Sequence, residues 1–312
     1  MEQNKNLIMK NINYTIIIPH KDIPQLLVRC IHSIPKRNDL EIIIVDDNSS
    51  QETKKILSEQ IQVDDHLTII YNLESKGGGG ARNLGLNKAE GKWILFADAD
   101  DFFNYCIIDI LDQYKNSTAD VIYFKGNSID TDTYTTTYRA NHLNKWINLY
   151  EKNPQKAELK LRYLFGEPWC KLIKKSLIDK YNIKFEETPI HNDTRFSYLV
   201  GFYAKNIKID NRALYCVTTR KNSVSVSSNL EKELIRVNVF SRAEGFFRQN
   251  HINVTINWHY KQCTSFLVKG KYQYYKKALR LIRMNSPFTF KSYLLYTKYL
   301  IINFIKFILF KL

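Results

Sequence analysis

The chain has no acidic residue after Glu244, although twelve lysines and arginines follow in its last 68 residues. The whole chain holds 46 Lys and Arg against 31 Asp and Glu, a net charge of +15, so the part before Glu244 is close to neutral. Its apolar content of 44% excludes a disordered or low-complexity protein. The uneven charge points to an anionic partner for the C-terminal part, either nucleic acid or a membrane surface.

Cysteine is scarce and scattered, with five residues and no C-x-x-C pair. An odd, dispersed set argues against a disulfide framework, and no Cys/His pair has the spacing of zinc ligands. Residues 1–13 are polar and show no secretory signal pattern. We therefore expect a cytoplasmic protein whose cysteines lie in its core.

A long uninterrupted apolar run is also missing, because Lys291, Lys298 and Lys306 divide the aromatic and aliphatic residues 287–312. This disfavours a transmembrane helix. At about 100° per residue the three lysines lie within about 80° of one another, beside a broad apolar face. That layout favours a helix lying in the surface of an anionic membrane over a helix that packs on the protein or forms a dimer contact.

The first hundred residues alternate between short apolar runs and helical patterns. Residues 14–19 form a β-branched run expected of a strand buried on both faces, and residues 24–33 carry apolar side chains at helical spacing. Further strands are expected at 41–45, 67–71 and 93–97, and helices at 51–60 and 81–89. The alternation predicts an α/β fold with a doubly wound, mostly parallel sheet.

The second half has weaker patterns. We expect strands at 120–124, 207–210 and 213–217, and a strand or a loop at 131–138. Helices are expected at 159–165, 174–180 and 230–249, followed by helical structure to the end with an interruption near Ser286 and Pro287.

Polar residues follow each strand of the first half, where a doubly wound sheet binds its ligands. Asp98, Asp100 and Asp101 come directly after residues 93–97, and such crowded carboxylates repel one another unless a cation neutralises them. Hard oxygen ligands suit Mg²⁺ or Mn²⁺. The alternative to a metal site is an acidic turn that faces solvent and binds no ligand.

A glycine run at 77–80 could bind phosphate through backbone N–H groups, or it could be a flexible loop. It lacks the Gly-Lys-Ser/Thr end of a P-loop and the G-x-G-x-x-G pattern of dinucleotide enzymes. Arg82 follows at the start of the next expected helix, where its charge could meet a nucleotide.

Four motifs in order resemble those of family 2 glycosyltransferases with the GT-A fold, of the type found in bacterial polysaccharide biosynthesis. They are Ile-Ile-Ile-Pro-His-Lys at 16–21, Ile-Ile-Val-Asp-Asp-Asn-Ser at 43–49, Gly-Ala-Arg-Asn-Leu-Gly at 80–85 and Ile-Leu-Phe-Ala-Asp-Ala-Asp-Asp at 94–101. The resemblance continues at Trp-Cys-Lys-Leu (169–172) and Asn-Asp (192–193), and covers residues 14–200.

The resemblance implies a role for each matching residue. Asp100, in a D-x-D motif, would bind Mn²⁺ or Mg²⁺, and Asp193 would be the catalytic base. The sequence departs from the family pattern at two places. His20-Lys21 stands where an aromatic-Asn pair is more common, which bears on donor preference, and Asn192 stands where Glu is usual, next to the base. The nucleotide of the donor would lie against Pro19, His20, Asp22, Asp47, Arg82 and Asp98.

The implied reaction moves a hexose-type sugar from a nucleotide diphosphate sugar, with UDP as the expected nucleotide, to a hydroxyl of a growing glycan or lipid-linked acceptor. One base without a second carboxylate as nucleophile favours single displacement with inversion. We expect residues 1–125 to bind the donor, 126–228 to bind the acceptor and hold the base, and 229–312 to associate with the inner face of the cell membrane.

Two other functions remain open on the sequence. A metal-dependent nucleotidyltransferase would also bind nucleotide and metal at a sheet edge, although it usually has a basic glycine-rich signature after the first strand. A nucleic-acid-binding protein would use the basic C-terminal part, but that charge is interleaved with apolar residues, so we expect no nucleic-acid partner.

Overall fold

The structure is a computed structural model, and it describes residues 11–220 and 229–310. By its internal contacts the chain forms two compact units. The first comprises Met1–Glu187 and Phe196–Arg220, and the second comprises Thr188–Arg195 and Lys221–Leu312. The three-part division of labour expected from the sequence remains a prediction.

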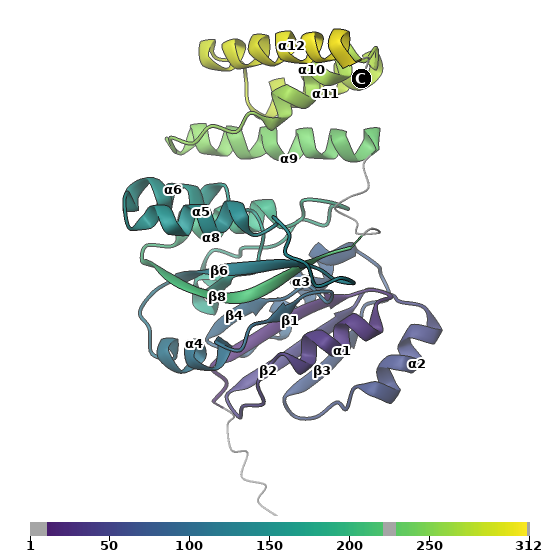
Figure 1. Cartoon of the computed structure of the whole chain (residues 1–312), viewed down its shortest axis with the longest axis vertical. Coiled ribbons are helices and arrows are strands. Elements are labelled where there is room, and N and C mark those ends of the chain that lie inside the picture. The colour runs from purple at the N-terminus through teal and green to yellow at the C-terminus, as the bar shows by residue number, and fades with distance from the viewer. Residues whose placement is uncertain (1–10, 221–228, 311–312) are drawn as a thin grey trace, which may run out of the picture. The chain divides into compact units, whose positions relative to one another are not determined.

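The first unit is built on an eight-stranded sheet (Figure 1) with the order β3-β2-β1-β4-β7-β6-β8-β5. Strands β3, β2, β1 and β4 are parallel neighbours, β7 runs antiparallel to both β4 and β6, and β6 pairs parallel with β8. The strands are β1 (Tyr14–His20), β2 (Leu40–Asp46), β3 (Leu67–Tyr71), β4 (Trp93–Phe96), β5 (Phe102–Phe103), β6 (Val121–Asp130), β7 (Lys171–Lys174) and β8 (Ile207–Thr219).

The strand order reverses at β1. From β1 the chain proceeds outward through β2 to β3, and then returns to place β4 on the other side of β1. In open α/β sheets the crevice beyond the carboxyl ends of the strands at such a point is where ligands bind. The ends of β1 and β4 are therefore the expected location of a site.

Helices connect and cover these strands. Figure 1 shows α1 and α2 together on one face of the β1–β3 part of the sheet. Ile17 of β1 is fully buried, and Gly85 of α3 lies so close that a Cβ there would be 2.5 Å from its Cγ2. The helices are α1 (Pro24–His32), α2 (Gln51–Gln60), α3 (Gly77–Lys88), α4 (Ile107–Tyr114), α5 (Asn141–Tyr150), α6 (Pro154–Tyr163), α7 (Lys175–Lys180) and α8 (Thr194–Tyr203).

The predicted α/β fold is confirmed, and β1 to β4, α1 and α2 lie within a residue or two of their expected positions. In the second half, residues 131–138, expected as a strand or a loop, form a loop with one isolated bridge from Thr136 to Ile129. The two short strands expected near 207 and 213 are instead one strand, β8. The register of β8 against β6 shifts near Lys125, so one strand carries an irregular apolar pattern.

The second unit contains four helices within the described residues. They enclose a core made by Val237, Tyr260, Cys263, Phe266, Ala278 and Ile282. The predicted helical C-terminal region is confirmed, with its interruption between α11 and α12. The helices are α9 (Leu230–Gln249), α10 (Trp258–Val268), α11 (Tyr272–Asn285) and α12 (Phe290–Phe310).

Within the described residues, α12 is long and apolar enough to cross a membrane by length and composition alone. Length and composition alone do not distinguish a spanning helix from one that lies in a membrane surface, so the expectation that α12 does not span stays a prediction. The packing of α12 against the other helices is the observation that can distinguish between these two arrangements.

Candidate active site

The end of β1 is held by a buried His–Asp pair. His20 Nδ1 lies 2.9 Å from Asp46 Oδ2, and His20 Nε2 accepts the backbone N–H of Ile23 at 3.2 Å, so the proton of the neutral ring is on Nδ1. Burial alone would raise the pKa of Asp46, but hydrogen bonds from His20 and Ser49 outweigh it and lower that pKa. Because His20 is 2% exposed and both ring nitrogens are engaged, it supports the loop after β1.

Asp22 and Asp47 tie neighbouring loops together at the same edge. Asp22, in a left-handed conformation with φ of 52°, accepts at Oδ1 the backbone N–H of Ser50 at 2.8 Å, ahead of α2. That bond is the main cause that lowers the pKa of Asp22. Asp47 accepts Asn72 Nδ2 at 2.8 Å and the backbone N–H of Gly77 at 2.9 Å, which joins the ends of β2 and β3 to the start of α3.

Arg82 and Asp98 form an ion pair at the end of β4. Arg82 Nη2 lies 2.5 Å from Asp98 Oδ1, and the guanidinium lies 5.4 Å from the centre of the Phe185 ring. The Arg82 side chain is 8% exposed and that of Asp98 is 29% exposed, so one partner is anchored while the other remains accessible. The two residues expected to contact the donor are thus adjacent in space.

Asp100 is fixed by its backbone and paired through its side chain. Its carbonyl accepts Arg29 Nη2 at 2.5 Å and Thr218 Oγ1 at 2.7 Å. Its carboxylate Oδ2 accepts Arg220 Nε at 3.0 Å, and both side chains are partly exposed. No local pattern in the sequence marks Arg29, Thr218 or Arg220 as partners of Asp100, so they could not be predicted from it.

Asp101 differs from its neighbours because its side chain lies in the interior. It is 2% exposed and accepts the backbone N–H of Thr218 at 2.7 Å. Burial, together with the charges of Asp98 and Asp100, raises the pKa of Asp101 well above its usual value. Asp101 is therefore distinct from Asp98 and Asp100, whose side chains are partly exposed.

A divalent cation fits this edge only with the help of a ligand. Among the described residues, no group of three or more His, Cys, Asp or Glu side chains could hold a metal ion. Mg²⁺ and similar ions are commonly bound by one or two carboxylates plus substrate phosphates and water. The partly exposed Asp100 carboxylate is suited to such a site, which a diphosphate would complete.

The glycine run is the first turn of α3 and not a loop. Helix α3 begins at Gly77, four residues before the expected start. At Gly80 an added Cβ would be 2.4 Å from Lys76 Cβ, so glycine here permits close packing within the turn.

Asp193 belongs to the second unit, in the segment Thr188–Arg195. It directly precedes α8, and two residues before it His191 accepts Arg236 Nε at 3.2 Å and packs edge-on to Phe240. Further along α8, Phe196 stacks on Phe185 in the first unit. The role of Asp193 as a base stays a prediction.

Comparison with known proteins assigns the chain to a family. The model described as Glycosyl transferase family 2 matches residues 15–181, which is more than half of the chain. Glycosyltransferase GlyA of Streptococcus pneumoniae serotype 4 is 25% identical over 224 residues, covering 68% of this chain and 31% of that relative. The chain thus spans about a third of the length of GlyA.

A second relative matches over most of its length. The Escherichia coli enzyme named UDP-Glc:alpha-D-GlcNAc-diphosphoundecaprenol beta-1,3-glucosyltransferase WfaP is 26% identical over 235 residues, covering 73% of this chain and 86% of the relative.

Two solved structures share the fold at low sequence identity. S. aureus TarS 1-349 in complex with UDP-GlcNAc has a TM-score of 0.64 at 16% identity, covering 96% of this chain and 92% of that chain. The mannosyltransferase PcManGT from Pyrobaculum calidifontis, in complex with GDP-Man and Mn²⁺, has a TM-score of 0.55 at 13% identity, covering 94% and 86%. The resemblance found in the sequence motifs is confirmed: the chain belongs to glycosyl transferase family 2, and it has the GT-A fold.

Proposed function

We propose that the protein transfers a hexose-type sugar from a UDP-sugar to a hydroxyl of a growing bacterial glycan. The observation that carries the proposal is the turn after β4, where Asp98 and Asp100 lie at the switch point of the sheet and each pairs with an arginine. Mixed positive and negative groups at a strand edge suit a metal-bound diphosphate. UDP is favoured because TarS, which shares the fold, is in complex with UDP-GlcNAc, and the name of the relative WfaP includes UDP-Glc.

Asp100 would hold the cation, Mn²⁺ or Mg²⁺, together with the diphosphate of the donor. A bound divalent cation would neutralise negative charge that builds on the leaving diphosphate. The PcManGT complex with Mn²⁺ supports this choice of ion. Arg220, which pairs with Asp100 in the structure, would then be available to the phosphates.

The nucleoside would lie beyond β1 and β2, against Pro19, His20, Asp22 and Asp47. Of these, Asp22 and Asp47 each keep carboxylate lone pairs beyond the hydrogen bonds described above. His20 would act by holding the loop, since its ring is buried and engaged on both nitrogens.

Asp193 would accept the proton of the acceptor hydroxyl. As that oxygen bonds to the anomeric carbon, the bond from this carbon to the diphosphate breaks, and the nucleoside diphosphate leaves with the electron pair. A single displacement of this kind inverts the anomeric configuration. The resemblance of Asn192-Asp193 to the motif that holds the base in the family supports the assignment.

The acceptor would be lipid-linked, and the protein would work as a peripheral protein at the cytoplasmic face of the cell membrane. The name of WfaP, which includes a diphosphoundecaprenol acceptor, supports this location. Family membership leaves a nucleotidyltransferase without support, because the motifs that matched are those of sugar transfer.

A thermal-shift panel tests the proposal. The intact protein is heated with UDP-, GDP- or dTDP-sugars, each with and without Mn²⁺. A ligand that binds only the folded state raises the melting temperature, and at one concentration a tighter ligand raises it more. We expect a UDP-sugar to stabilise the protein and Mn²⁺ to increase the shift. Stabilisation by none of the donors would contradict the proposed function.

A further inference from the structure

Helix α12 presents an apolar stripe that no described part of the chain covers. Phe290, Leu294, Ile301 and Ile308 are between 54% and 80% exposed. At about 100° per residue they fall within about 40° of one another, along about 27 Å of helix. An exposed apolar stripe of this length on a folded protein marks an interaction surface.

The opposite side of α12 is fastened to the second unit. Leu295, Tyr296 and Tyr299 pack against its core, and Asn303 Nδ2 donates to Lys261 O at 2.9 Å and to Thr264 Oγ1 at 2.8 Å. A helix held along one side by polar and apolar contacts cannot expose its whole circumference to lipid. The packing therefore favours a helix lying in a surface over a helix that spans a membrane.

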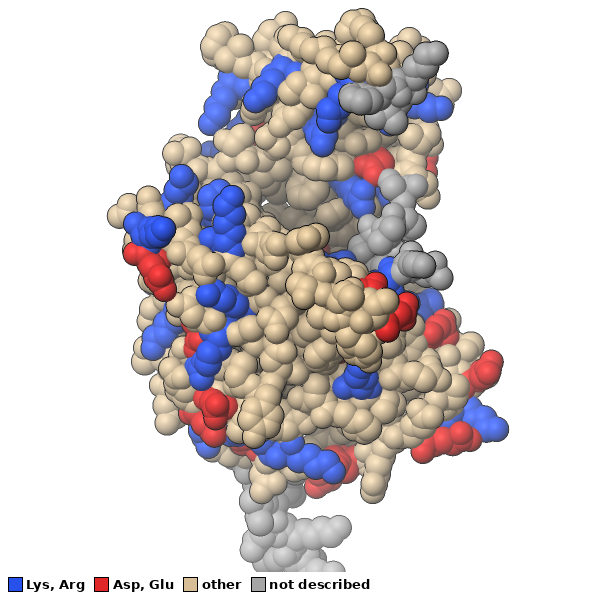
Figure 2. Space-filling view, in the orientation of Figure 1, with Lys and Arg blue, Asp and Glu red and all other residues tan. Residues whose placement is uncertain are grey.

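Cationic side chains of α11 line two adjoining hollows, one of which reaches α12. Lys276, Arg280 and Arg283 of α11 occur at i, i+4 and i+7, and with Leu279 and Met284 they line a hollow of about 380 Å³. Leu279 and Arg283 also line an adjoining hollow of about 460 Å³ that extends to Tyr293 of α12. Figure 2 shows this end of the unit as an uncharged band over α12 with blue side chains beneath it.

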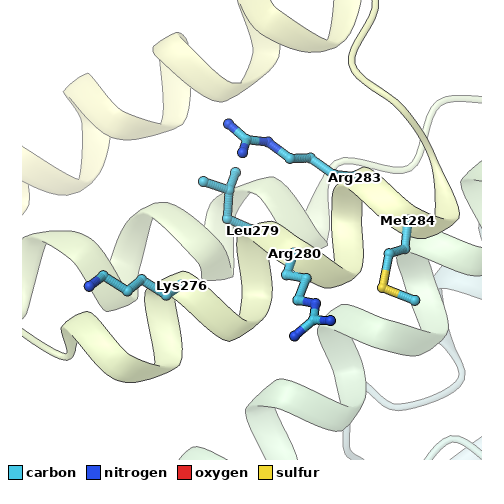
Figure 3. A pocket seen from close by; sticks show the side chains of 5 residues that line it. All are labelled: Lys276, Leu279, Arg280, Arg283 and Met284. Atoms are coloured by element: carbon cyan, nitrogen blue, oxygen red, sulfur yellow. The ribbon is translucent and has the colours of Figure 1, made fainter.

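The direction of these cations distinguishes a surface from a small-ligand site. In Figure 3 the side chains of Lys276, Arg280 and Arg283 point in three different directions from α11, and their charged groups do not converge on one point. One phosphate ion could not contact all of them. Several anionic headgroups in a plane could.

We propose that the apolar stripe of α12 and the basic face of α11 form one docking surface for an anionic lipid bilayer, with α12 in the plane of the membrane. Charge decides between a bilayer and a second copy of the chain. No acidic residue follows Glu244, so two such surfaces would repel each other, whereas anionic lipids attract each added Lys or Arg. The inference gives a structural basis to the membrane location in the proposed function.

Vesicle sedimentation with the full chain tests the surface. Without any sugar donor, the protein is mixed with vesicles of phosphatidylcholine containing 30% phosphatidylglycerol (roughly the anionic content of a bacterial leaflet) or with phosphatidylcholine alone. We expect binding to the anionic vesicles only, and a decrease of binding with added salt. Equal binding to both vesicles, or no binding, would overturn the proposal.

A matched pair of variants identifies the residues. Leu294→Glu with Ile301→Glu places two charges on the stripe, and should weaken vesicle binding about tenfold or more because two apolar side chains no longer enter the interface. Leu73→Glu with Tyr134→Glu adds the same charges at exposed sites of the first unit and should bind like the unchanged protein. Equal weakening by both pairs, or by neither, contradicts the assignment.

Two readouts keep alternative outcomes distinct. Light scattering after gel filtration reports whether the Leu294→Glu/Ile301→Glu pair dissociates a dimer, a result that would replace the bilayer by a second copy. Thermal stabilisation by the UDP-sugar should be the same in all these variants. A variant that loses vesicle binding but is still stabilised by the UDP-sugar has a defect in the docking surface alone. A variant that binds vesicles but is no longer stabilised by the UDP-sugar has a defect in the transfer site alone.

Discussion

The carboxylates at the sheet edge differ in what surrounds them, and this difference divides their tasks. Asp46 and Asp101 are buried and hydrogen-bonded to neighbouring loops, so they shape the edge. Asp98 and Asp100 are partly exposed and paired with arginines, so they can exchange those partners for a ligand. Chemical activity is therefore expected of the second pair.

Replacement of the proposed base should separate binding from transfer. Asp193→Asn keeps the shape of the side chain but cannot take a proton, so we expect donor affinity within about twofold and transfer reduced by about 100-fold or more. Calorimetric titration measures the affinity, and release of nucleoside diphosphate in the presence of acceptor measures the rate. Asp109→Asn, on the exposed face of α4, is the control. Unchanged turnover in the Asp193 variant would remove this residue from the mechanism.

Site residues that lie close to a strand end could be predicted from the sequence, whereas those that folding brings to the site from distant positions could not. Asp98, Asp100 and Arg82 follow predictable elements within a few residues, so their meeting could be foreseen. Arg220 reaches Asp100 across 120 positions of the chain, through the pairing of β5, which follows Asp100, with β8, which precedes Arg220. No spacing in the sequence encodes such a contact.

Among the elements, α3 depends on its approach to β1. Gly85→Ala would gain about 1 kcal/mol of helix propensity but would place a Cβ 2.5 Å from Cγ2 of Ile17, which is buried and β-branched and so cannot move easily. We expect the free energy of unfolding to fall by about 1–3 kcal/mol.

Denaturant titration measures the effect of Gly85→Ala. Asn87→Ala, at an exposed position of the same helix, is the control, because it gains helix propensity without the clash. Its free energy of unfolding should fall by no more than about 0.5 kcal/mol. If Gly85→Ala were as stable as the unchanged protein, the close packing of α3 on β1 would be incorrect.

A buried carboxylate joins the helices of the second unit. Glu244 of α9 accepts His259 Nε2 at 2.9 Å, Tyr260 OH at 2.7 Å, Ser286 Oγ at 2.9 Å and Arg248 Nη2 at 2.7 Å. Burial alone would raise the pKa of Glu244, but the bond from His259 and the other partners outweigh it and lower that pKa. A lowered folded-state pKa stabilises the unit above the usual Glu value of 4.5.

The corresponding prediction is a pH-dependent loss of stability in Glu244→Gln. Near neutral pH the variant should lose about 2–4 kcal/mol, because an amide cannot satisfy all four donors. The difference from the unchanged protein should shrink as pH falls below about 4.5 and the carboxylate is protonated. Thermal unfolding between pH 3 and pH 7 measures it, with Glu231→Gln at an exposed position of α9 as control. A difference that does not vary with pH would exclude the charge as the cause.

The elements themselves were predictable where their pattern was strong. Buried parallel strands and the 20-residue helix α9 were predicted within a residue or two. The two-residue β5 and four-residue β7 are too short for any period, and α3 begins within a glycine run that local propensity disfavours in a helix. Tertiary packing decides these three cases.

For the whole molecule, charge and chemistry are segregated along the sequence. The first unit carries the sheet edge with its mixed charges, and the second carries the excess of positive charge and the exposed apolar helix. Fold class followed from the alternation of elements, and family from ordered motifs. The acceptor and the donor sugar could not be predicted, because no motif or spacing in the sequence specifies the shape of a sugar-binding pocket.

In the proposed site, a divalent cation bound by Asp100 would hold the diphosphate of the donor. Calorimetric titration of UDP into the protein, with and without Mn²⁺, measures this without turnover. We expect Mn²⁺ to strengthen UDP binding about tenfold or more in the unchanged protein and in Asp109→Asn, and to have no such effect in Asp100→Asn. If Mn²⁺ strengthened UDP binding equally in Asp100→Asn, the cation would be held elsewhere and the account of the site would be incorrect.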